Sequence, residues 1–407
     1  MTAEPRLWVV SELYYPEQTS TGYFLTRIAE GLADSRRVEA ICGRPTYSER
    51  GQEVRRKEVR GGVTIHRMRA THFDKDRLAL RALNAVTLSL SVLFFALRHF
   101  RRGDQVLIVT NPPTLPPLVG WVARIKGMRS ILLVHDVYPE VLVATRFVRA
   151  DGFLHRLLQR AFDATYRLFD DVVVLGRDMH EVAGRKVRDP VRRLHIIPNW
   201  GDTDEIGPVA RRDNPFAHAQ GLVDKRVIQF SGNIGRTHDV ETILAVAERL
   251  RDCPEIVFLF AGYGGKAGLI GDAPNVMLLP RQPRDLLGPM LNCADATIIS
   301  FVDAMYGVSV PSRMYNVMAA GTPIIAMADP RSELSLTIAE SGAGWTVPQG
   351  DVDALERLIR EICDPANSAE RERRGEAARA AVLASFTLDR VLDLYRKLLD
   401  ARTTRSR

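Results

Sequence analysis

Short apolar runs of strand length alternate with amphipathic stretches along almost the whole chain. The runs lie at Leu7–Leu13, Arg37–Gly43, Val63–Met68, Gln105–Thr110, Ser130–Asp136, Asp171–Leu175, His195–Asp202, Arg226–Ser231, Ile256–Gly264, Asn275–Pro280, Ala296–Ser300, Pro323–Met327 and Gly342–Pro348. Helical periodicity fills several intervals, at Gly22–Leu32, Leu78–Leu97, Asp239–Leu250 and Leu388–Ala401. Strands alternating with helices predict an α/β fold with mostly parallel sheets.

One segment shows this alternation most clearly. After the run Ala296–Ser300, Ser312 is placed to cap a helix, and Gly321 is placed to end it before the next run begins at Pro323. The loop of such a unit lies at the carboxyl end of a strand, where open α/β sheets bind ligands. Arg313 adds a fixed positive charge at that point.

The alternation occurs in two successive sets, separated by a segment rich in Pro, Arg and Asp at residues 207–220. A chain of 407 residues is long enough for two domains with substantial cores. We therefore predict an N-terminal Rossmann-like domain over residues 1–205 and a second over 222–385. Residues 386–407 should form a C-terminal helix that packs back on the N-terminal domain, followed by a basic tail.

The composition is that of a globular protein with a basic balance. Its four cysteines form no C-x-x-C pair, so neither a disulfide framework nor a zinc site is indicated, and a reducing cytoplasm fits best. The N-terminal residues lack the features of a signal peptide. The net charge of +7 and the pI near 9.4 favour anionic partners. Nucleic acid is the least supported of these, because no nucleic-acid-binding motif occurs.

The helix expected at Leu78–Leu97 is long and apolar but contains Arg81 and several hydroxyl residues, which argues against a clean transmembrane span. Arg98, Arg101 and Arg102 follow it directly. A core helix against the sheet and a helix in the membrane interface share this periodicity. Both interpretations remain open at this point.

Several strand ends carry residues suited to ligand binding. His135 and Asp136 end one strand of the first set, and Gly22 opens the first helix. In the second set, a loop with two glycines and Arg236 joins a strand to a helix and suits a diphosphate, although it lacks the Walker lysine and the G-x-G-x-x-G spacing. Asp202 and Asp204 form a D-x-D that could hold a divalent metal, but the surrounding Gly and Thr favour a turn.

The motifs in and around these strand ends resemble those of bacterial family-4 glycosyltransferases of GT-B architecture that build colanic acid and O-antigen. Ile197–Asp202 is similar to the boundary pattern I-P-N-G-x-D, with Trp200 at the usual glycine. Pro311–Ala326 resembles the donor-site segment P-S-K-x-Y-E-x-M-A-x-G-x-P-V-I-A. Phe230–Gly235 and Asp136–Glu140 are also similar to segments of these enzymes. The resemblance covers nearly the whole chain and implies two doubly wound Rossmann-like domains facing a central cleft.

The sequence departs from the family at the donor sugar. Val308 and Asn316 stand where many retaining members carry glutamates, and His238 stands about where a lysine is common. Asn316 can still bind a ribose hydroxyl, whereas Glu333 or backbone groups would have to replace the other glutamate. Arg236 then becomes the candidate for the diphosphate.

The resemblance implies a site in which both domains take part. It makes His135, Asp136 and Arg236 the candidate catalytic residues, with Glu140 as a further group that could orient the acceptor hydroxyl. The implied donor-binding residues are Gly22, Gly232, Asn233, Arg236, Arg281, Gln282, Ser312, Arg313, Asn316 and Glu333. The family uses no metal, and the nucleotide-sugar is a substrate, so no cofactor is expected.

The implied activity is a hexosyl or N-acetylhexosaminyl transfer (EC 2.4), retaining and metal-independent, from a nucleoside-diphosphate sugar, with a UDP-sugar preferred. The acceptor would be a saccharide linked to a polyprenyl diphosphate, used in cell-surface polysaccharide, exopolysaccharide or O-antigen biosynthesis. The enzyme would then work as a peripheral protein on the anionic inner face of the cell membrane. Two alternatives are a non-catalytic nucleotide-sugar-binding subunit of a glycosyltransferase complex and a nucleotide-sugar 2-epimerase.

Overall fold

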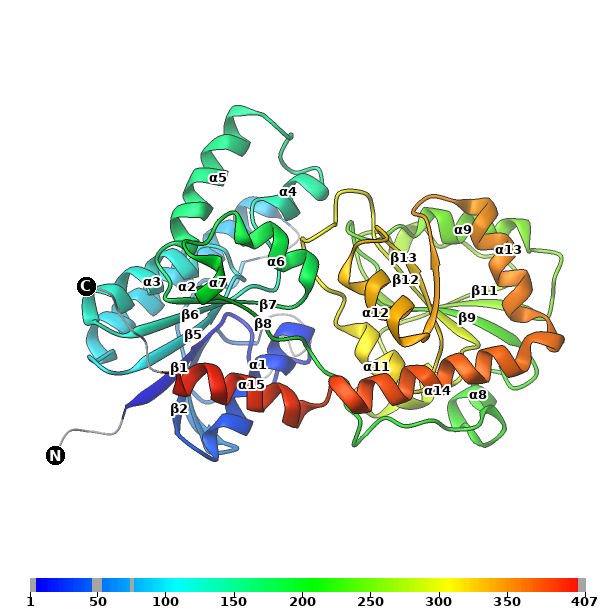
Figure 1. Ribbon diagram of the computed structural model, residues 1–407, viewed down its shortest axis with the longest axis horizontal. Helices are drawn as coiled ribbons and strands as arrows, with labels where there is room; N and C mark the ends of the chain where they lie inside the picture. The colour runs from blue at the N-terminus through cyan, green and yellow to red at the C-terminus, as the bar shows by residue number, and fades with distance from the viewer. Residues whose placement is uncertain (1–4, 46–52, 74–76, 402–407) are drawn as a thin grey trace. The chain divides into compact units, whose positions relative to one another are not determined.

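The computed structural model describes residues 5–45, 53–73 and 77–401, which form two compact units. The first unit comprises Met1–Glu140, Val148–Ile197 and Leu392–Arg407, and the second comprises Val141–Phe147 and Pro198–Val391. Each unit has its own sheet of mainly parallel strands, covered by helices (Figure 1).

The first unit is built on an eight-stranded sheet in the order β3-β4-β2-β1-β5-β6-β7-β8. The strands are β1 (Arg6–Val10), β2 (Arg37–Cys42), β3 (Lys57–Arg60), β4 (Val63–Arg67), β5 (Gln105–Val109), β6 (Arg129–Leu133), β7 (Asp171–Val174) and β8 (Leu194–Ile196). All neighbours pair in parallel except β3 with β4. The central strands are buried on both faces, as expected for parallel strands covered by helices.

The helices of this unit connect successive strands. They are α1 (Ser20–Ala33), α2 (Leu78–His99), α3 (Leu115–Lys126), α4 (Glu140–Ala144), α5 (Phe153–Tyr166), α6 (Arg177–Gly184) and α7 (Pro190–Arg193), with α4 and α15 (Leu388–Asp400) shared between the two units. The part of α15 in the first unit packs on α1, because Leu392 fills the space over Gly31 and Arg396 donates to the Gly31 carbonyl at 3.0 Å. A side chain at residue 31 would collide with Leu392.

The second unit contains a six-stranded, fully parallel sheet in the order β11-β10-β9-β12-β13-β14. The strands are β9 (Arg226–Asn233), β10 (Ile256–Tyr263), β11 (Val276–Leu279), β12 (Ala296–Ser300), β13 (Ile324–Met327) and β14 (Gly344–Val347). Its helices are η1 (Arg211–Asp213), α8 (Pro215–Ala219), α9 (Glu241–Arg249), η2 (Ala267–Leu269), η3 (Arg284–Leu286), α10 (Leu287–Asn292), α11 (Arg313–Ala319), α12 (Glu333–Ser341), α13 (Val352–Cys363), η4 (Pro365–Asn367) and α14 (Ser368–Ser385).

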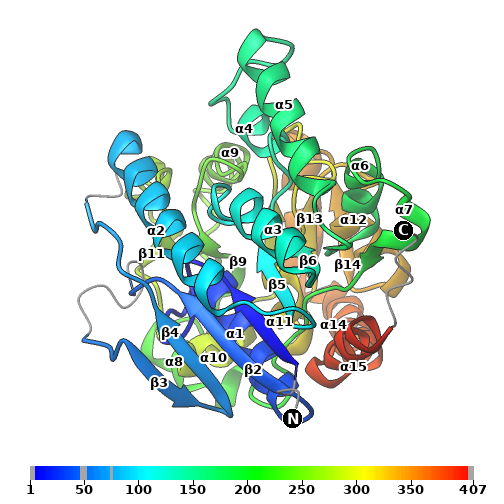
Figure 2. The same ribbon diagram turned by 90° about the vertical axis from the view of Figure 1, so that its left-hand side faces the viewer.

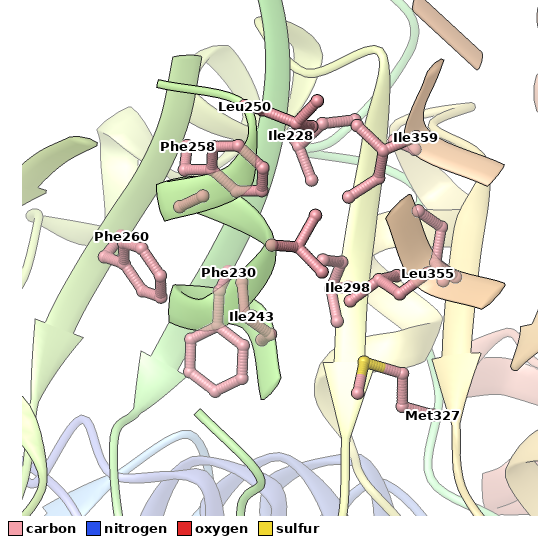
Figure 3. Close-up of a cluster of buried hydrophobic side chains, with 14 of the residues drawn as sticks. Ile228, Phe230, Ile243, Leu250, Phe258, Phe260, Ile298, Met327, Leu355 and Ile359 are labelled. Atoms are coloured by element: carbon pink, nitrogen blue, oxygen red, sulfur yellow. The ribbon is translucent and has the colours of Figure 1, made fainter. Parts of the chain in front are cut away.

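A dense apolar core holds one face of this sheet. Aliphatic and aromatic side chains from β9, β10, β12 and β13 meet those of α9 and α13, as Figure 3 shows for Phe230, Phe258, Ile298 and Leu355 among others. These side chains are almost fully buried. The core fixes the positions of the strands, and so the positions of the loops at their carboxyl ends.

The α/β class and the two Rossmann-like domains predicted from the sequence are confirmed. The antiparallel strand β3 was not predicted, because its short polar segment lacks a clear apolar pattern. Residues 207–220, expected to be a linker, include η1 and α8 and belong to the second unit, which begins at Pro198. The predicted basic tail at residues 402–407 lies outside the described residues.

Candidate functional site

In the second unit, the carboxyl ends of three neighbouring strands carry several of the predicted donor-binding residues. Gly232 and Asn233 end β9, Arg313 begins the helix that follows β12, and Glu333 begins the helix that follows β13. Because β9, β12 and β13 are adjacent in the sheet, these segments share one edge. This is the edge at which open parallel sheets bind ligands.

The Arg313 guanidinium is held in a fixed position at this edge. It donates to the Ser231 carbonyl at 2.6 Å and to Nε2 of His238 at 2.7 Å, and it lies 4.9 Å from the Phe230 ring centroid. A Cβ added at Gly232 would lie 3.4 Å from the guanidinium, so the glycine leaves room beside the charge. Burial lowers the pKa of Arg313 to about 10, which still leaves it protonated at neutral pH.

His238 orients Arg313, a role that the sequence did not indicate. Its Nδ1 lies 2.7 Å from the Ser300 carbonyl, which can only accept, so Nδ1 carries the proton and Nε2 accepts from Arg313. The ring is buried and stacks on Phe301 with centroids 5.6 Å apart. Burial and the nearby Arg313 lower the pKa of His238 to about 3, so the ring is neutral. His238 therefore supports Arg313 as an uncharged group.

Close packing against the end of β9 requires glycine at the end of β10. Gly262 has φ +149°, and a Cβ there would lie 1.8 Å from the Gly232 carbonyl oxygen. Gly264 has φ +155°, and its Cβ would meet the Ile234 carbonyl at 2.3 Å and the Asn233 side chain at 2.8 Å. Asn233 itself is exposed next to these glycines. The glycines therefore have a structural role whether or not a ligand is bound.

Two predicted residues have surroundings that differ from those of Arg313. Arg236 is exposed and its guanidinium lies 5.2 Å from the Phe147 ring centroid, within the second unit. Ser312 occupies the N-cap position of α11, as predicted, but its side chain makes no capping hydrogen bond. With a helix of seven residues and no cap, the positive charge at this edge comes mainly from Arg313.

The positions that replace the family's glutamates are both engaged in the fold. Val308 is buried, with 1% of its surface exposed. Asn316 accepts from the Asp202 amide at 2.9 Å through Oδ1. Glu333 is buried at the start of α12 and accepts from Thr337 at 3.1 Å. None of these contacts depends on a ligand.

Asp202, the first residue of the D-x-D, begins a turn in which the Ile206 amide donates to the Asp202 carbonyl at 2.8 Å. Its carboxylate forms an ion pair with Arg284. Over the described parts of the chain, no cluster of three or more His, Cys, Asp or Glu side chains is placed to hold a metal ion. Arg281 and Gln282 follow β11, the edge strand, and Gln282 donates to the Pro280 carbonyl at 2.9 Å.

In the first unit, the carboxyl ends of β5 and β6 and the start of α1 meet at His135. Its Nδ1 lies 3.2 Å from the Thr21 hydroxyl, and its backbone amide donates to the Thr110 hydroxyl at 3.2 Å. The Asp136 amide points to the same Thr110 oxygen at 3.4 Å. The two threonines were not predicted, although each stands where a strand or helix adjoins the sheet edge.

Burial shifts both titratable groups of this cluster toward their neutral forms. It lowers the pKa of His135 to about 4 and raises the pKa of Asp136 to about 6. His135 is therefore neutral at pH 7, while Asp136 is mainly ionised but titrates close to neutrality. Carboxyl groups with pKa values near the working pH are suited to accept or donate protons.

Two neighbours of this cluster have structural partners. Gly22 lies in the first turn of α1, where a Cβ would come within 2.8 Å of the Glu17 carbonyl oxygen, so close packing explains the glycine. Glu140 pairs with the buried ammonium group of Lys186 at 2.7 Å, and Asp163 lies 3.3 Å from the same group. Glu140 is thus already committed to an ion pair with Lys186.

Comparisons with known proteins identify the family. Residues 21–200 match the model of the glycosyl transferase 4-like domain, and residues 213–381 match that of the glycosyl transferases group 1. The chain is 33% identical over 365 residues to a probable glycosyltransferase, WbjE, of Pseudomonas aeruginosa, covering 88% of this chain and 90% of that protein. It belongs to the family-4 glycosyltransferases. The predicted family is confirmed.

Two further similarities agree with this assignment. The chain is 27% identical over 366 residues to a putative colanic acid biosynthesis glycosyl transferase, WcaI, of Escherichia coli K12, covering 86% of this chain and 89% of that protein. The structure of Anabaena HepE in complex with UDP and glucose superposes with a TM-score of 0.72 at 12% identity, covering 98% of this chain and 100% of that one. Solved glycosyltransferases share the fold, so GT-B, as predicted, is its architecture.

Proposed function

We propose that this glycosyltransferase moves a hexosyl or N-acetylhexosaminyl group from a UDP-sugar to a lipid-linked saccharide, with retention of configuration and without a metal ion. The observation that carries the proposal is the fixed position of Arg313 beside Gly232, at the shared edge of β9 and β12. A half-buried guanidinium with backbone room next to it suits a diphosphate, because it presents several donors in a planar fork.

The donor chemistry follows from this arrangement. When the bond between the sugar and the nucleotide breaks, negative charge develops on the leaving diphosphate, and a cation that is already oriented stabilises it without reorganisation. Arg313 supplies that charge, while His238 and the Ser231 carbonyl hold its fork in place. The exposed Arg236 is the second candidate cation. Because Arg313 stabilises the charge on the leaving diphosphate, the transfer needs no divalent ion.

The acceptor chemistry is assigned to the cluster at the carboxyl end of β6. Asp136 orients the acceptor hydroxyl, and the neutral His135, tied to Thr21, forms a hydrogen bond with the sugar. In a retaining transfer the departing phosphate takes the acceptor proton. Asp136 therefore acts in positioning, and its pKa of about 6 keeps it mostly ionised for that role at pH 7.

The relatives and the fold support the proposed substrates. HepE was solved with UDP and glucose, which makes UDP the first donor to test. WcaI is described as an enzyme of colanic acid biosynthesis, so a cell-surface polysaccharide assembled on a polyprenyl diphosphate is the proposed pathway. That acceptor would place the enzyme at the cytoplasmic face of the membrane.

A thermal-shift panel with UDP, GDP, CDP and dTDP tests the donor site. A nucleotide at a hundred times its dissociation constant stabilises the protein by about 2.7 kcal/mol, which gives a clear increase in melting temperature. We expect UDP to produce this increase in the wild type. The variants Arg313→Ala and Arg313→Lys should bind about tenfold or more weakly, because a charge-assisted hydrogen bond contributes about 1.5–3 kcal/mol. Arg251→Ala, an exposed arginine of the same unit, should behave as the wild type.

Turnover separates the proposal from its alternatives. Transfer of radiolabelled sugar from the UDP-sugar to a membrane lipid extract is the expected result. Conversion of the donor alone into an epimer would instead indicate a 2-epimerase, and UDP binding with no turnover in the extract would indicate a binding subunit. If none of the four nucleotides raised the melting temperature, the proposed donor site itself would be contradicted.

A further inference from the structure

Three neighbouring helices of the first unit expose large apolar side chains to solvent. On α2 these are Leu83, Val86, Leu90 and Phe94, with between 43% and 69% of each residue exposed. Their spacing of three or four residues places them in one stripe along the helix. Such a stripe needs an explanation, because soluble proteins seldom expose contiguous apolar surface.

The opposite face of α2 is part of the protein core. Leu88, Val92 and Ala96 are almost fully buried, and the helix packs against α3 while it connects β4 to β5. The segment Ala79–His99 is long and apolar enough to cross a membrane by length and composition. Its buried face and its place between two strands of one sheet show that it packs in the first unit. The helix is therefore both a core helix and an exposed apolar one.

The neighbouring helices continue the exposed apolar surface. Trp121 and Ile125 lie one turn apart on α3, with 51% and 57% exposed. On α5, Phe153, Leu154 and Leu157 are exposed by 78%, 53% and 53%. Because α3 contacts both α2 and α5, the three helices form one layer over the sheet (Figure 2). We call these nine side chains on α2, α3 and α5 the apolar face.

The charge along α2 and α3, which carry six of the nine side chains of the apolar face, has one sign. Between Leu78 and His135 the sequence contains a single acidic residue, Asp104, and this one is buried in an ion pair with Arg6. Over the same interval there are seven lysine and arginine residues. Exposed ones lie beside the apolar face, such as Arg124 on α3, and outside this interval Arg156 on α5 is also exposed.

We propose that the apolar face docks on an anionic lipid bilayer, with the helices lying in the plane of the interface and the arginines among the headgroups. This inference deepens the proposed function, on which it rests, by naming the surface that would bring the enzyme to a lipid-linked acceptor. Apolar burial and electrostatic attraction act together in such binding, and Trp121 is a residue type enriched at membrane interfaces.

The charge pattern favours a bilayer over a second copy of the chain. A symmetric dimer through this face would bring the flanking arginines of one copy toward those of the other, because a two-fold interface pairs the same patch with itself. Acidic side chains that could neutralise them are missing from the sequence of α2 and α3. An anionic membrane supplies the missing negative charge.

Vesicle sedimentation with the full chain tests the proposal. Purified protein is mixed with vesicles of phosphatidylcholine alone or of phosphatidylcholine with phosphatidylglycerol, at low and at high salt. We expect binding to the anionic vesicles that weakens at high salt, since screening acts on exposed charges. The variants Phe94→Glu and Phe153→Glu should each bind about tenfold or more weakly, because an aromatic side chain that the bilayer would bury is replaced by a charge.

Matched controls lie in the same unit. Val59 on β3 and Val191 on α7 are exposed by 70% and 92%, away from the apolar face, so Val59→Glu and Val191→Glu should bind vesicles as the wild type does. Melting temperatures of all four variants should stay near that of the wild type, because exposed positions are changed.

Three results would overturn the inference: no binding of the wild type to anionic vesicles, equal loss in the apolar-face and control variants, or a dimer in analytical ultracentrifugation that the apolar-face variants dissociate. The UDP-induced thermal shift is measured on the same samples. A normal thermal shift without vesicle binding would refute the docking surface and leave the donor proposal intact. Vesicle binding without the thermal shift would refute the donor proposal and leave the docking surface intact.

Discussion

Replacement of His238 by glutamine tests how Arg313 is supported. The histidine donates from Nδ1 to the Ser300 carbonyl and accepts from Arg313 at Nε2, and it does so only when neutral. Glutamine also has one donor and one acceptor group, but it does not titrate. His238→Gln should therefore change the pH dependence of stability more than the stability at neutral pH.

The magnitude follows from the two pKa values of the histidine. Its pKa is about 3 in the fold and 6.5 in the unfolded chain, so between these values only the unfolded chain binds the proton. Stability from this group is fully present above pH 6.5 and is lost as the pH falls toward 3. At pH 5 the loss amounts to about 2 kcal/mol relative to pH 7.5, since one pKa unit corresponds to about 1.4 kcal/mol.

Hydrogen exchange measured by mass spectrometry is the suitable assay, because it reports the free energy of opening for separate segments. Peptides from β9 and β12 report the unit that contains His238, whatever happens in the first unit. After correction for intrinsic exchange, the free energy of opening should fall by about 2 kcal/mol more in the wild type than in His238→Gln between pH 7.5 and pH 5.

His135, whose pKa is also lowered, lies in the first unit and is unchanged in the variant, so its contribution cancels. Equal losses in the wild type and the variant would show that His238 is not buried as a neutral ring. The assigned tautomer and the support of Arg313 would then both be wrong.

Two further predictions concern packing and charge. Gly262→Ala should destabilise the second unit by more than about 3 kcal/mol, because its Cβ would collide with a backbone oxygen at a positive φ, whereas Gly265→Ala, with open space around it, should change the melting temperature little. Lys186→Met should cost about 3–5 kcal/mol in urea unfolding, because it leaves two carboxylates at a site built around a buried ammonium group. Lys397→Met, at an exposed position, is its control, and comparable losses in both would contradict the importance of the buried pair.

The fold was largely predictable from the sequence, because parallel strands buried on both faces form continuous apolar runs between turn residues. Strand β12 and helix α11 lie where the alternation places them, and Gly321 ends the helix with φ +68° as expected. Helix starts were less predictable. Helix α1 begins at Ser20 with Thr19 as its cap, two residues before the predicted start, because several neighbouring hydroxyl residues can cap equally well.

The candidate site was only partly predictable. Arg313 was identified from its position after a strand, since the carboxyl edge of a parallel sheet is fixed by the topology. The contact between Arg313 and His238 was not, because these residues are 75 positions apart in the sequence, and only the adjacency of β9 and β12 brings them together. The partner of Asn316 was not predicted either. Its side chain was expected to bind a ribose hydroxyl, and in the fold it accepts a hydrogen bond from the Asp202 amide.

Helix α2 shows why periodicity alone left two interpretations open. In a helix with one apolar stripe and one polar stripe, the sequence indicates that the apolar side faces the core. In α2 both stripes are apolar, one through Leu88 and Val92 and the other through Leu90 and Phe94, so the pattern fits a core helix and an interfacial helix equally. Leu88 and Val92 of the first stripe are buried in the core of the unit. Leu90 and Phe94 of the second stripe are exposed by 45% and 69%, so packing within this unit accounts for only part of its apolar character, and the proposed contact with a bilayer would bury the rest.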